Sequence, residues 1–307
     1  METVSNLADI DCDKEIAITI GNFDGVHLGH KKVLSSMQQN CKNENFEFIV
    51  LTFSTHPSFV LRPKDNFLLT SYTERNELIS KLGIKWICEL EFTRDFSTKS
   101  PKEFLEEFIF INDKIKKIYV GHDFAFGANK SGDYELVKEL CLEKNIVVEQ
   151  CEQFSLNEKS ISSTQIRSKI QNGEIEQASK LLDRFFSLNG PVIKGEGRGK
   201  QIGFATANIF VGKEMIIPKK GVYITKTTIN DMNYHSVTNI GINPTFKDNN
   251  SISIETHILD FDKDIYGENL KVEFIKKLRD EKKFSSVNEL IAQIKKDVVL
   301  VKEYFLE

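Results

Sequence analysis

The first half of the chain, to about residue 150, alternates short apolar runs with amphipathic stretches. The apolar runs have the length and composition of β-strands and lie at residues 15–20, 46–53, 85–92, 117–121 and 146–151. Ser100, Pro101 and Glu103 mark a helix start between two of them, with a serine cap and a capping-box glutamate. Strands that alternate with helices predict an α/β fold with a parallel sheet, whose ligands bind beyond the carboxyl ends of the strands.

The pattern changes after Leu188. Residues 162–184 have helical spacing, and a glycine-rich segment precedes short β-patterned runs at 221–229, 234–242 and 251–261. These runs predict a small antiparallel barrel or sandwich. We therefore expect two domains, residues 1–186 and 187–307.

A final helix is predicted at the C-terminus. Ser286 and Glu289 form a capping-box pair. The apolar residues that follow helical spacing are Val287, Leu290, Ile291, Ile294, Val298, Val301 and Phe305.

Composition favours a packed cytoplasmic protein that acts on small molecules. Of 307 residues, 40% are hydrophobic and 28% charged, and the net charge of −4 offers no basic footprint for nucleic acid or anionic membrane. The five cysteines form no C-x-x-C pair, so neither a zinc knuckle nor a disulfide framework is indicated. The N-terminus lacks a signal-peptide pattern, and no apolar run approaches the roughly 20 residues of a membrane span.

The first candidate site is GNFDGVHLGH, residues 21–30, at the end of the first predicted strand. A helix that begins near Gly29 would offer free N–H groups to an anion, with His27 and His30 as donors beside it. This geometry suits a polyphosphate. Two solvated histidines, or half of a zinc site, are the alternatives that these residues leave open.

A second helix start, ISSTQIRSKI, occupies residues 161–170. Ser162, Ser163 and Thr164 are candidate caps, and Arg167 could grip a phosphate with two hydrogen bonds. The segments 55–63 and 121–133 each follow a predicted strand and are expected on the same edge as His27, although either alone is typical of a loop.

GNFDGVHLGH resembles the adenylyl- and cytidylyltransferase superfamily, whose His-x-Gly-His signature class I aminoacyl-tRNA synthetases share. ISSTQIR is similar to the Ile-Ser-Ser-Thr-x-x-Arg motif of nucleotidyltransferases, whereas the Lys-Met-Ser-Lys-Ser motif of synthetases is missing from the sequence. With THPSFVLRP and GHDFAFGANKSGD, these strings resemble the adenylyltransferase half of the bacterial bifunctional riboflavin kinase/FAD synthetase family. The resemblance implies that the ATP phosphates are stabilised by His27, His30, Ser163, Thr164 and Arg167, and that further nucleotide contacts come from Gly21, Asn22, Phe23, Asp24, His56 and Asp123.

The glycine-rich segment KGEGRGKQIGFATANI, residues 194–209, is the other candidate site. Its backbone could bind phosphate, although it is not a P-loop and a flexible basic turn is the alternative. Thr206 and Asn208 would share one face of a strand and offer oxygen ligands to Mg²⁺. Glu255 faces away from its apolar neighbours, which fits a solvated face or a general base.

This segment and the strings PKKGVYIT, NIGINPTF, ETHILDF and YGENLKVEFIKKLRDEKKF resemble the riboflavin kinase module of the same family. The resemblance implies Mg²⁺–nucleotide binding by Thr206 and Asn208, a catalytic base in Glu255, and an arginine near the flavin in Arg279. It also implies nucleotide contacts from Gly195, Gly197, Arg198 and Gly203. The resemblance extends from about Ile16 to the end of the chain.

By this resemblance we expect a Rossmann-like nucleotidyltransferase domain followed by a β-barrel riboflavin kinase domain with a terminal helix. The enzyme would make FMN from riboflavin and ATP, and then FAD from FMN and a second ATP. The sequence does not choose between a monomer and a homo-oligomer.

The chain departs from the family pattern in two places. Ala205 stands where the family usually has the proline of Pro-Thr-Ala-Asn, so we expect a weakened kinase, and Asp183-Arg184-Phe185 replaces Gly-Arg-Pro at the junction. Two other functions therefore stay open: a monofunctional FAD synthetase with a weakened kinase module, and a non-catalytic flavin-binding protein.

Overall fold

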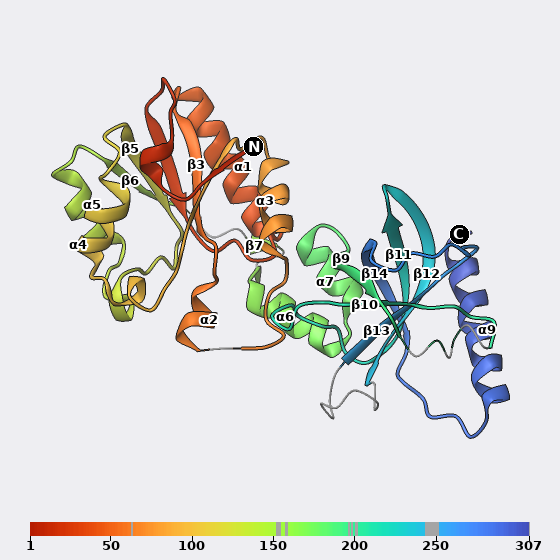
Figure 1. Ribbon diagram of the computed structural model, residues 1–307. Coiled ribbons are helices and arrows are strands. Elements are labelled where there is room, and N and C mark those ends of the chain that lie inside the picture. The colour runs from red at the N-terminus through yellow and green to blue at the C-terminus, as the bar shows by residue number, and fades with distance from the viewer. Residues whose placement is uncertain are drawn as a thin grey trace. The chain divides into compact units, whose positions relative to one another are not determined.

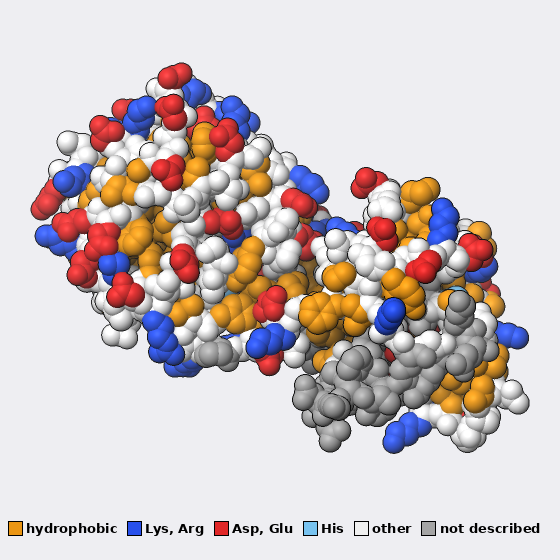
Figure 2. Space-filling model, viewed as in Figure 1, with side chains coloured by type: hydrophobic (Ala, Val, Ile, Leu, Met, Phe, Trp, Pro, Cys, Tyr) orange, Lys and Arg blue, Asp and Glu red, His pale blue; other side chains and the backbone are white. Residues whose placement is uncertain are grey.

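The computed structural model describes residues 1–62, 64–151, 155–156, 159–195, 197, 199, 202–242 and 252–306. The chain forms two compact units, Met1–Ser163 (unit 1) and Thr164–Glu307 (unit 2) (Figure 1). Acidic and basic side chains are interspersed on the face of each unit that Figure 2 shows. Among the described helices, none has both the length and the apolar composition that crossing a membrane requires.

Unit 1 is built on a parallel sheet of six strands in the order β1-β4-β3-β2-β5-β6. The strands are β1 (Glu2–Val4), β2 (Ile16–Ile20), β3 (Glu47–Phe53), β4 (Trp86–Leu90), β5 (Ile115–Val120) and β6 (Val147–Gln150). The predicted strands of this half are therefore confirmed. Strand β1 is an addition, because its short sequence Glu-Thr-Val has no apolar alternation to detect. A small hairpin, β7 (Ser155–Leu156) and β8 (Lys159–Ser160), follows the sheet.

Helices cover both faces of this sheet (Figure 1). On one face lie α1 (Leu28–Asn43) and α3 (Tyr72–Ser80), and on the other lie α4 (Pro101–Phe104), its π-helical continuation Leu105–Ile109, and α5 (Tyr134–Leu142). The capping box predicted at Ser100 and Glu103 is present at the start of α4.

Each face has its own apolar core. Leu34 and Met37 of α1 belong to the same buried cluster as Val50 of the sheet, whereas Phe104 and Val137 belong to the cluster on the opposite face. Because strands buried on both faces read as continuous apolar runs, this arrangement explains why the sequence pattern located them.

The order of the strands creates a switch point between β2 and β5. After β2 the chain adds β3 and β4 on one side, and it then crosses to the other side for β5. In open parallel sheets, ligands bind outside the carboxyl ends of the strands at such a point. The loops that follow β2, β3 and β5 all lie at this edge.

Unit 2 begins with α6 (Ser163–Asn172, whose first residue closes unit 1) and α7 (Ile175–Leu182). A closed antiparallel barrel in the order β10-β13-β12-β11-β14-β9 follows, as predicted. Its strands are β9 (Phe186–Ile193), β10 (Ala207–Ile209), β11 (Gly221–Ile229), β12 (Met232–Ile242), β13 (Ile252–Ile258) and β14 (Asn269–Arg279). Asp183 ends α7 in the left-handed conformation (φ 56°), which glycine adopts without strain.

The barrel interior contains a chain of buried hydroxyl groups. Thr256, Thr238, Thr225, Ser236 and Thr227 are fully buried and hydrogen-bonded in that order, at 2.7 to 2.9 Å. Each hydroxyl has a partner, so these polar groups are satisfied within the core.

Helix α9 (Val287–Tyr304) covers one side of the barrel. Ser286 caps it as predicted by accepting from the N–H of Glu289 at 3.2 Å, but the Glu289 carboxylate accepts from the N–H of Ser285, so the predicted capping box is only half correct. Val301 is fully buried against the barrel, whereas Val287, which shares the helical spacing, is 59% exposed. Val287 lies in the first turn of the helix, and the barrel core instead includes Val301 near the other end.

A buried ion pair fastens α9 to the barrel. Asp297 of α9 is 2% exposed and accepts from Nε and Nη2 of Arg279 at the end of β14, with the Nη2–Oδ2 distance at 2.8 Å. Gln293 adds a further hydrogen bond to Asp297 at 2.9 Å.

We predict that Asp297→Asn lowers the free energy of unfolding of unit 2 by about 2 kcal/mol, because the charged Arg279 guanidinium is left without an opposite charge beside it. Asp280→Asn is the matched control, because Asp280 is 72% exposed in its pair with Lys277, and it should change stability far less than Asp297→Asn does. Calorimetric unfolding of both variants measures the difference. Equal effects would show that burial of the Arg279–Asp297 pair is irrelevant to docking of α9.

Candidate active sites

His27 and His30 lie at the start of α1, where the sequence places an anion site. Nδ1 of His27 accepts from the N–H of His30 at 3.2 Å and so caps the helix. An accepting Nδ1 carries no proton, so the neutral ring holds its proton on Nε2 and can donate from there. The two imidazole rings are stacked, with centroids 3.6 Å apart.

Two polar atoms of this loop lack partners inside the described chain. Nδ1 of His30 and Oδ1 of Asn22 are both shielded from solvent without a hydrogen bond. Burial, and secondarily the nearby His27, hold the pKa of His30 well below its ordinary 6.5, so its ring is neutral. Buried polar atoms are normally paired, and a bound ligand would supply the missing partners.

The backbone of this loop is strained. Phe23 (φ 49°) and Val26 (φ 35°) both occupy the left-handed region, which a non-glycine residue enters at about 1–3 kcal/mol. The Asp24 carboxylate stabilises the strained shape by accepting from the N–H groups of Leu69 (3.0 Å) and Thr70 (3.3 Å). These contacts give Asp24 a role in loop shape, and its predicted contact with nucleotide stays a prediction.

Gly21 and Phe23 also depend on each other. A Cβ atom at Gly21, just after β2, would lie 2.8 Å from the Phe23 ring, so a side chain there would force the ring to move. The Phe23 ring in turn meets His30 edge-on, with centroids 5.4 Å apart.

The start of α6 is attached to the same loop. The Ser163 hydroxyl donates to the carbonyl of Asp24 at 2.9 Å, which brings Ser163 to the His27 loop as the sequence predicts. Thr164 and Arg167 follow on α6 and belong to unit 2, so their part in the site stays a prediction.

His56 and Asp123 follow β3 and β5 on the same edge of the sheet. Nδ1 of His56 caps the short helix α2 (Pro57–Leu61) by accepting from the N–H of Ser58 at 3.1 Å. The backbone N–H of His56 donates to the Tyr72 hydroxyl at 2.8 Å. Asp123 is exposed. Within the described residues, no group of three or more His, Cys, Asp or Glu side chains could hold a metal ion.

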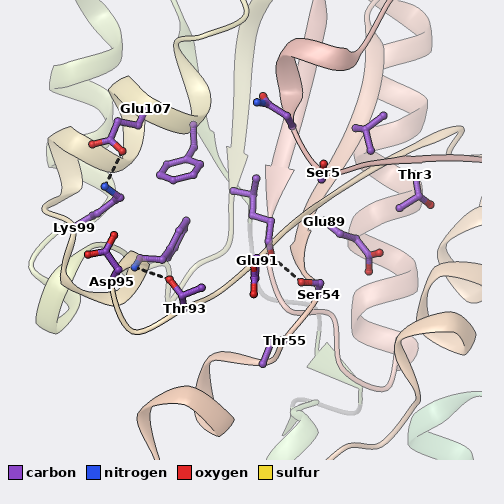
Figure 3. A pocket seen from close by; sticks show the side chains of 15 residues that line it. Thr3, Ser5, Ser54, Thr55, Glu89, Glu91, Thr93, Asp95, Lys99 and Glu107 are labelled. Atoms are coloured by element: carbon purple, nitrogen blue, oxygen red, sulfur yellow. Dashed lines mark hydrogen bonds and ion pairs between the residues drawn. The ribbon is translucent and has the colours of Figure 1, made fainter.

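The sequence analysis missed a cavity of about 790 Å³ at this edge. Figure 3 shows its lining, which combines residues beyond β1, β3 and β4 with the segment 93–108. Glu89, Glu91 and Asp95 give it an acidic wall, and Lys99 pairs with Glu107 at 2.7 Å. Its aromatic floor is part of a cluster in which the Phe96 ring lies 4.9 to 5.8 Å from the rings of Phe53, Phe92, Phe104 and Phe108.

The sequence analysis also missed Arg75. It is 3% exposed near the start of α3 and bonds to groups at the ends of three strands, yet nothing in the run Tyr-Thr-Glu-Arg-Asn distinguishes it from a surface arginine. A hydrophobic pattern cannot reveal it, because its neighbours Glu74 and Asn76 are buried as well.

In unit 2, three polar residues lie side by side on three adjacent strands of the barrel. Asn208 of β10 is directly opposite Glu255 of β13, whose other neighbour is Asn239 of β12. Ala207, Ile254 and Thr256 are buried, so by strand alternation these polar residues face outward. Asn208 and Glu255, which were expected to share a site, are therefore adjacent.

Two glycines enclose the candidate magnesium ligands. A Cβ atom at Gly195 would lie 2.2 Å from Nδ2 of Asn208, and one at Gly199 would lie 3.3 Å from Oγ1 of Thr206. Gly197 and Gly203 take left-handed conformations, with φ of 68° and 87°. Glycine therefore allows the close approach of Gly195 to Asn208, and it allows the left-handed backbone at Gly197 and Gly203. Arg198, the predicted nucleotide contact within it, lies outside the described residues.

The segment around Ala205 is held by His257, whose Nδ1 lies 2.7 Å from the Ala205 carbonyl oxygen. A cavity of about 210 Å³ opens beside it, with Thr206, Ile258 and Tyr266 in its lining. Arg279, predicted near the flavin, is engaged by Asp297 and by the carbonyl of Asp280, so its flavin contact stays a prediction.

The lowered pKa of His30 generates a testable pH dependence. Since the unfolded chain binds a proton at about pH 6.5 and the folded chain resists it, the unfolding free energy falls as the pH drops below 6.5. Between pH 7.5 and 5.5, we predict that His30→Gln loses about 1 kcal/mol less stability than the unmodified protein. Denaturant titration followed by the fluorescence of Trp86, the single tryptophan, measures the unfolding free energy of unit 1 at each pH. Equal losses in both proteins would contradict the prediction.

Comparison with known proteins matches both units. The family model for FAD synthetase matches residues 9–165, and the family model for riboflavin kinase matches residues 182–305. A crystal structure of a Streptococcus pneumoniae protein named a macrolide-efflux protein has a TM-score of 0.86 at 28% identity over 98% of both chains.

Two relatives match nearly the whole chain. One, from Bacillus subtilis, is 36% identical over 94% of this chain and 92% of its own length. Another, from Listeria monocytogenes, is 37% identical over 96% of this chain and 93% of its own length. Both are named bifunctional riboflavin kinase/FMN adenylyltransferase. Because both family models match and these relatives align over nearly the whole chain, this chain belongs to the bifunctional riboflavin kinase/FMN adenylyltransferase family.

Proposed function

We propose that this chain phosphorylates riboflavin to FMN in residues 187–307 and adenylylates FMN to FAD in residues 1–186, with ATP as the donor in both steps. The His27–His30 pair at the switch point of the parallel sheet is the observation that carries the second assignment. Matches to both family models support the two activities together. The location proposed is the cytoplasm, in keeping with five cysteines that are all free.

In the adenylyl transfer, the FMN phosphate is already an anionic nucleophile and needs no general base. It attacks the α-phosphorus of ATP, and pyrophosphate leaves. His27 can donate a hydrogen bond from Nε2 to the phosphates, at the N-terminal end of α1, where the helix dipole favours an anion. The unpaired Nδ1 of His30 and Oδ1 of Asn22 mark the same corner as polar and able to accept a ligand. Thr164 and Arg167 complete the proposed phosphate contacts.

We assign the flavin of this reaction to the 790 Å³ cavity. Its aromatic floor, with Phe96 and Phe108, offers the stacking surface that a planar ring system needs. Glu89, Glu91 and Asp95 are acceptors for ring N–H and ribityl hydroxyl groups (Figure 3). The cavity lies at the edge where the β2 loop presents His27, so acceptor and donor would meet there.

For the kinase, the oxygens of Thr206 and Asn208 suit Mg²⁺, and the glycines that enclose them leave room for phosphate. When bound, Mg²⁺ neutralises charge on the transferred phosphoryl group. Glu255, directly opposite Asn208, would accept the proton of the attacking ribityl hydroxyl. The 210 Å³ cavity beside Thr206 is the proposed position of the nucleotide base.

Disabling each site separately tests the proposal. We expect His27→Ala with His30→Ala to abolish FAD formation while FMN formation continues, and Glu255→Ala to stop FMN formation from riboflavin while FAD still forms from supplied FMN. Chromatography of flavins after incubation with ATP and Mg²⁺ separates the products. A folded variant that lost both activities would contradict separate sites, and an unmodified chain that made neither FMN nor FAD would support a flavin-binding protein.

Ala205 distinguishes a full kinase from a weakened one. We predict that Ala205→Pro raises kcat/KM for riboflavin phosphorylation about two- to fivefold, because a fixed φ reduces the conformational freedom of the segment before Thr206. The adenylyl transfer is the internal control and should not change. A decrease in phosphorylation would show that the family proline does not fit this chain, and an unmodified chain that forms FAD only from FMN would favour the monofunctional alternative.

A further inference from the structure

Arg75 bonds to the ends of three adjacent strands in unit 1. Its Nη1 donates to the carbonyl of Phe53, the last residue of β3, at 3.0 Å, and makes a longer bond of 3.5 Å to the carbonyl of Asn22, just beyond β2. Its Nη2 forms an ion pair with Glu89 of β4. Nε donates to Asn76 at 3.2 Å, so all three nitrogens of the guanidinium are used.

Two of these contacts reach groups that have a place in the proposed reaction. Asn22 belongs to the loop that carries His27 and His30, and its own amide oxygen is one of the buried atoms without a partner. Glu89 lines the large cavity assigned to the flavin (Figure 3). Tyr72, one turn earlier on α3, contacts the Arg75 guanidinium and accepts from the N–H of His56.

Stability alone does not explain such a residue. Removing a guanidinium from water is unfavourable by several kcal/mol, and a buried ion pair often gives no more stability than apolar side chains of similar volume. What a planar fork with fixed donors adds is geometry, since it holds several acceptors at set distances. Two of the acceptors here, the Asn22 carbonyl and the Glu89 carboxylate, belong to the two substrate sites proposed for unit 1.

We infer that Arg75 is a positioning residue for adenylyl transfer, which sets the spacing between the β2 loop that binds ATP and the cavity that binds FMN. This inference rests on the proposed function of unit 1. Arg75 touches neither substrate. It aligns the FMN phosphate with the α-phosphorus through the Asn22 carbonyl on one side and Glu89 on the other.

The test compares Arg75→Met and Arg75→Lys in the full chain with a control, Lys117→Met. Lys117 is 7% exposed and pairs with Glu44 and Glu149 at 2.9 and 3.0 Å, so it too is a buried cation of unit 1. Glu44 follows the end of α1 opposite to His27, which keeps this pair away from the loops of the site. Melting of each variant is followed by Trp86 fluorescence, and kcat and KM are measured for both reactions.

Arg75→Met is expected to lower kcat for FAD formation from FMN about 100-fold, as a misplacement near 1 Å can, with KM for ATP changed less than about threefold. Riboflavin phosphorylation by the same molecules should stay within about twofold. Arg75→Lys keeps the charge without the fork and should recover part of the loss. Lys117→Met should leave FAD formation nearly unchanged, even where it lowers the melting temperature as much.

The inference is overturned if Arg75→Met retains kcat, or if its loss matches that of Lys117→Met at an equal change in melting temperature. Should Arg75→Met fail to fold, Arg75→Lys decides: a fall in kcat of about fivefold or more at an unchanged melting temperature supports positioning, and an unchanged kcat refutes it. Failure of the proposed function shows differently, as an unmodified chain that forms no FAD from FMN and ATP.

Discussion

The carboxylate of Asp24 is the contact on which the geometry of unit 1 depends. By accepting from the amides of Leu69 and Thr70, it stabilises a loop in which Phe23 and Val26 occupy the left-handed region. The carbonyl of the same residue receives the hydroxyl of Ser163 and so fixes where α6 begins. Three segments that are distant in the sequence therefore meet at one residue, and the stacked histidines take their position from it.

The barrel positions its candidate site residues in a different way. Its candidate residues need no strained loop, because strand register alone places Asn208 beside Glu255. Glycine supplies the space instead, since a side chain at Gly195 would collide with the Asn208 amide. One chain thus holds two candidate sites for phosphate chemistry, the first organised by buried hydrogen bonds around a helix start and the second by β-pairing and the omission of side chains.

The sequence predicted the parts of the fold that have a local signal. Apolar runs located the strands because both faces of the sheet are buried, and Ser100 with Glu103 located α4 because capping is a contact between near neighbours. Contacts between distant segments left no such signal. The polar strand β1, the large cavity and the role of Arg75 each depend on residues brought together by the sheet. Likewise, Val287 fits the helical period, but only the docking of α9 shows that it lies outside the core.

The hydroxyl chain inside the barrel has a consequence for how this family can vary. Thr238 is the hydrogen-bond partner of Thr256, so replacing Thr238 with valine would orphan the Thr256 hydroxyl, whereas Thr225 would keep its bond to Ser236. Exchanging all the members for apolar residues of similar shape would leave no orphan. Positions 238 and 256 should consequently vary together among homologues, and a barrel that carries valine at 238 should carry an apolar residue at 256.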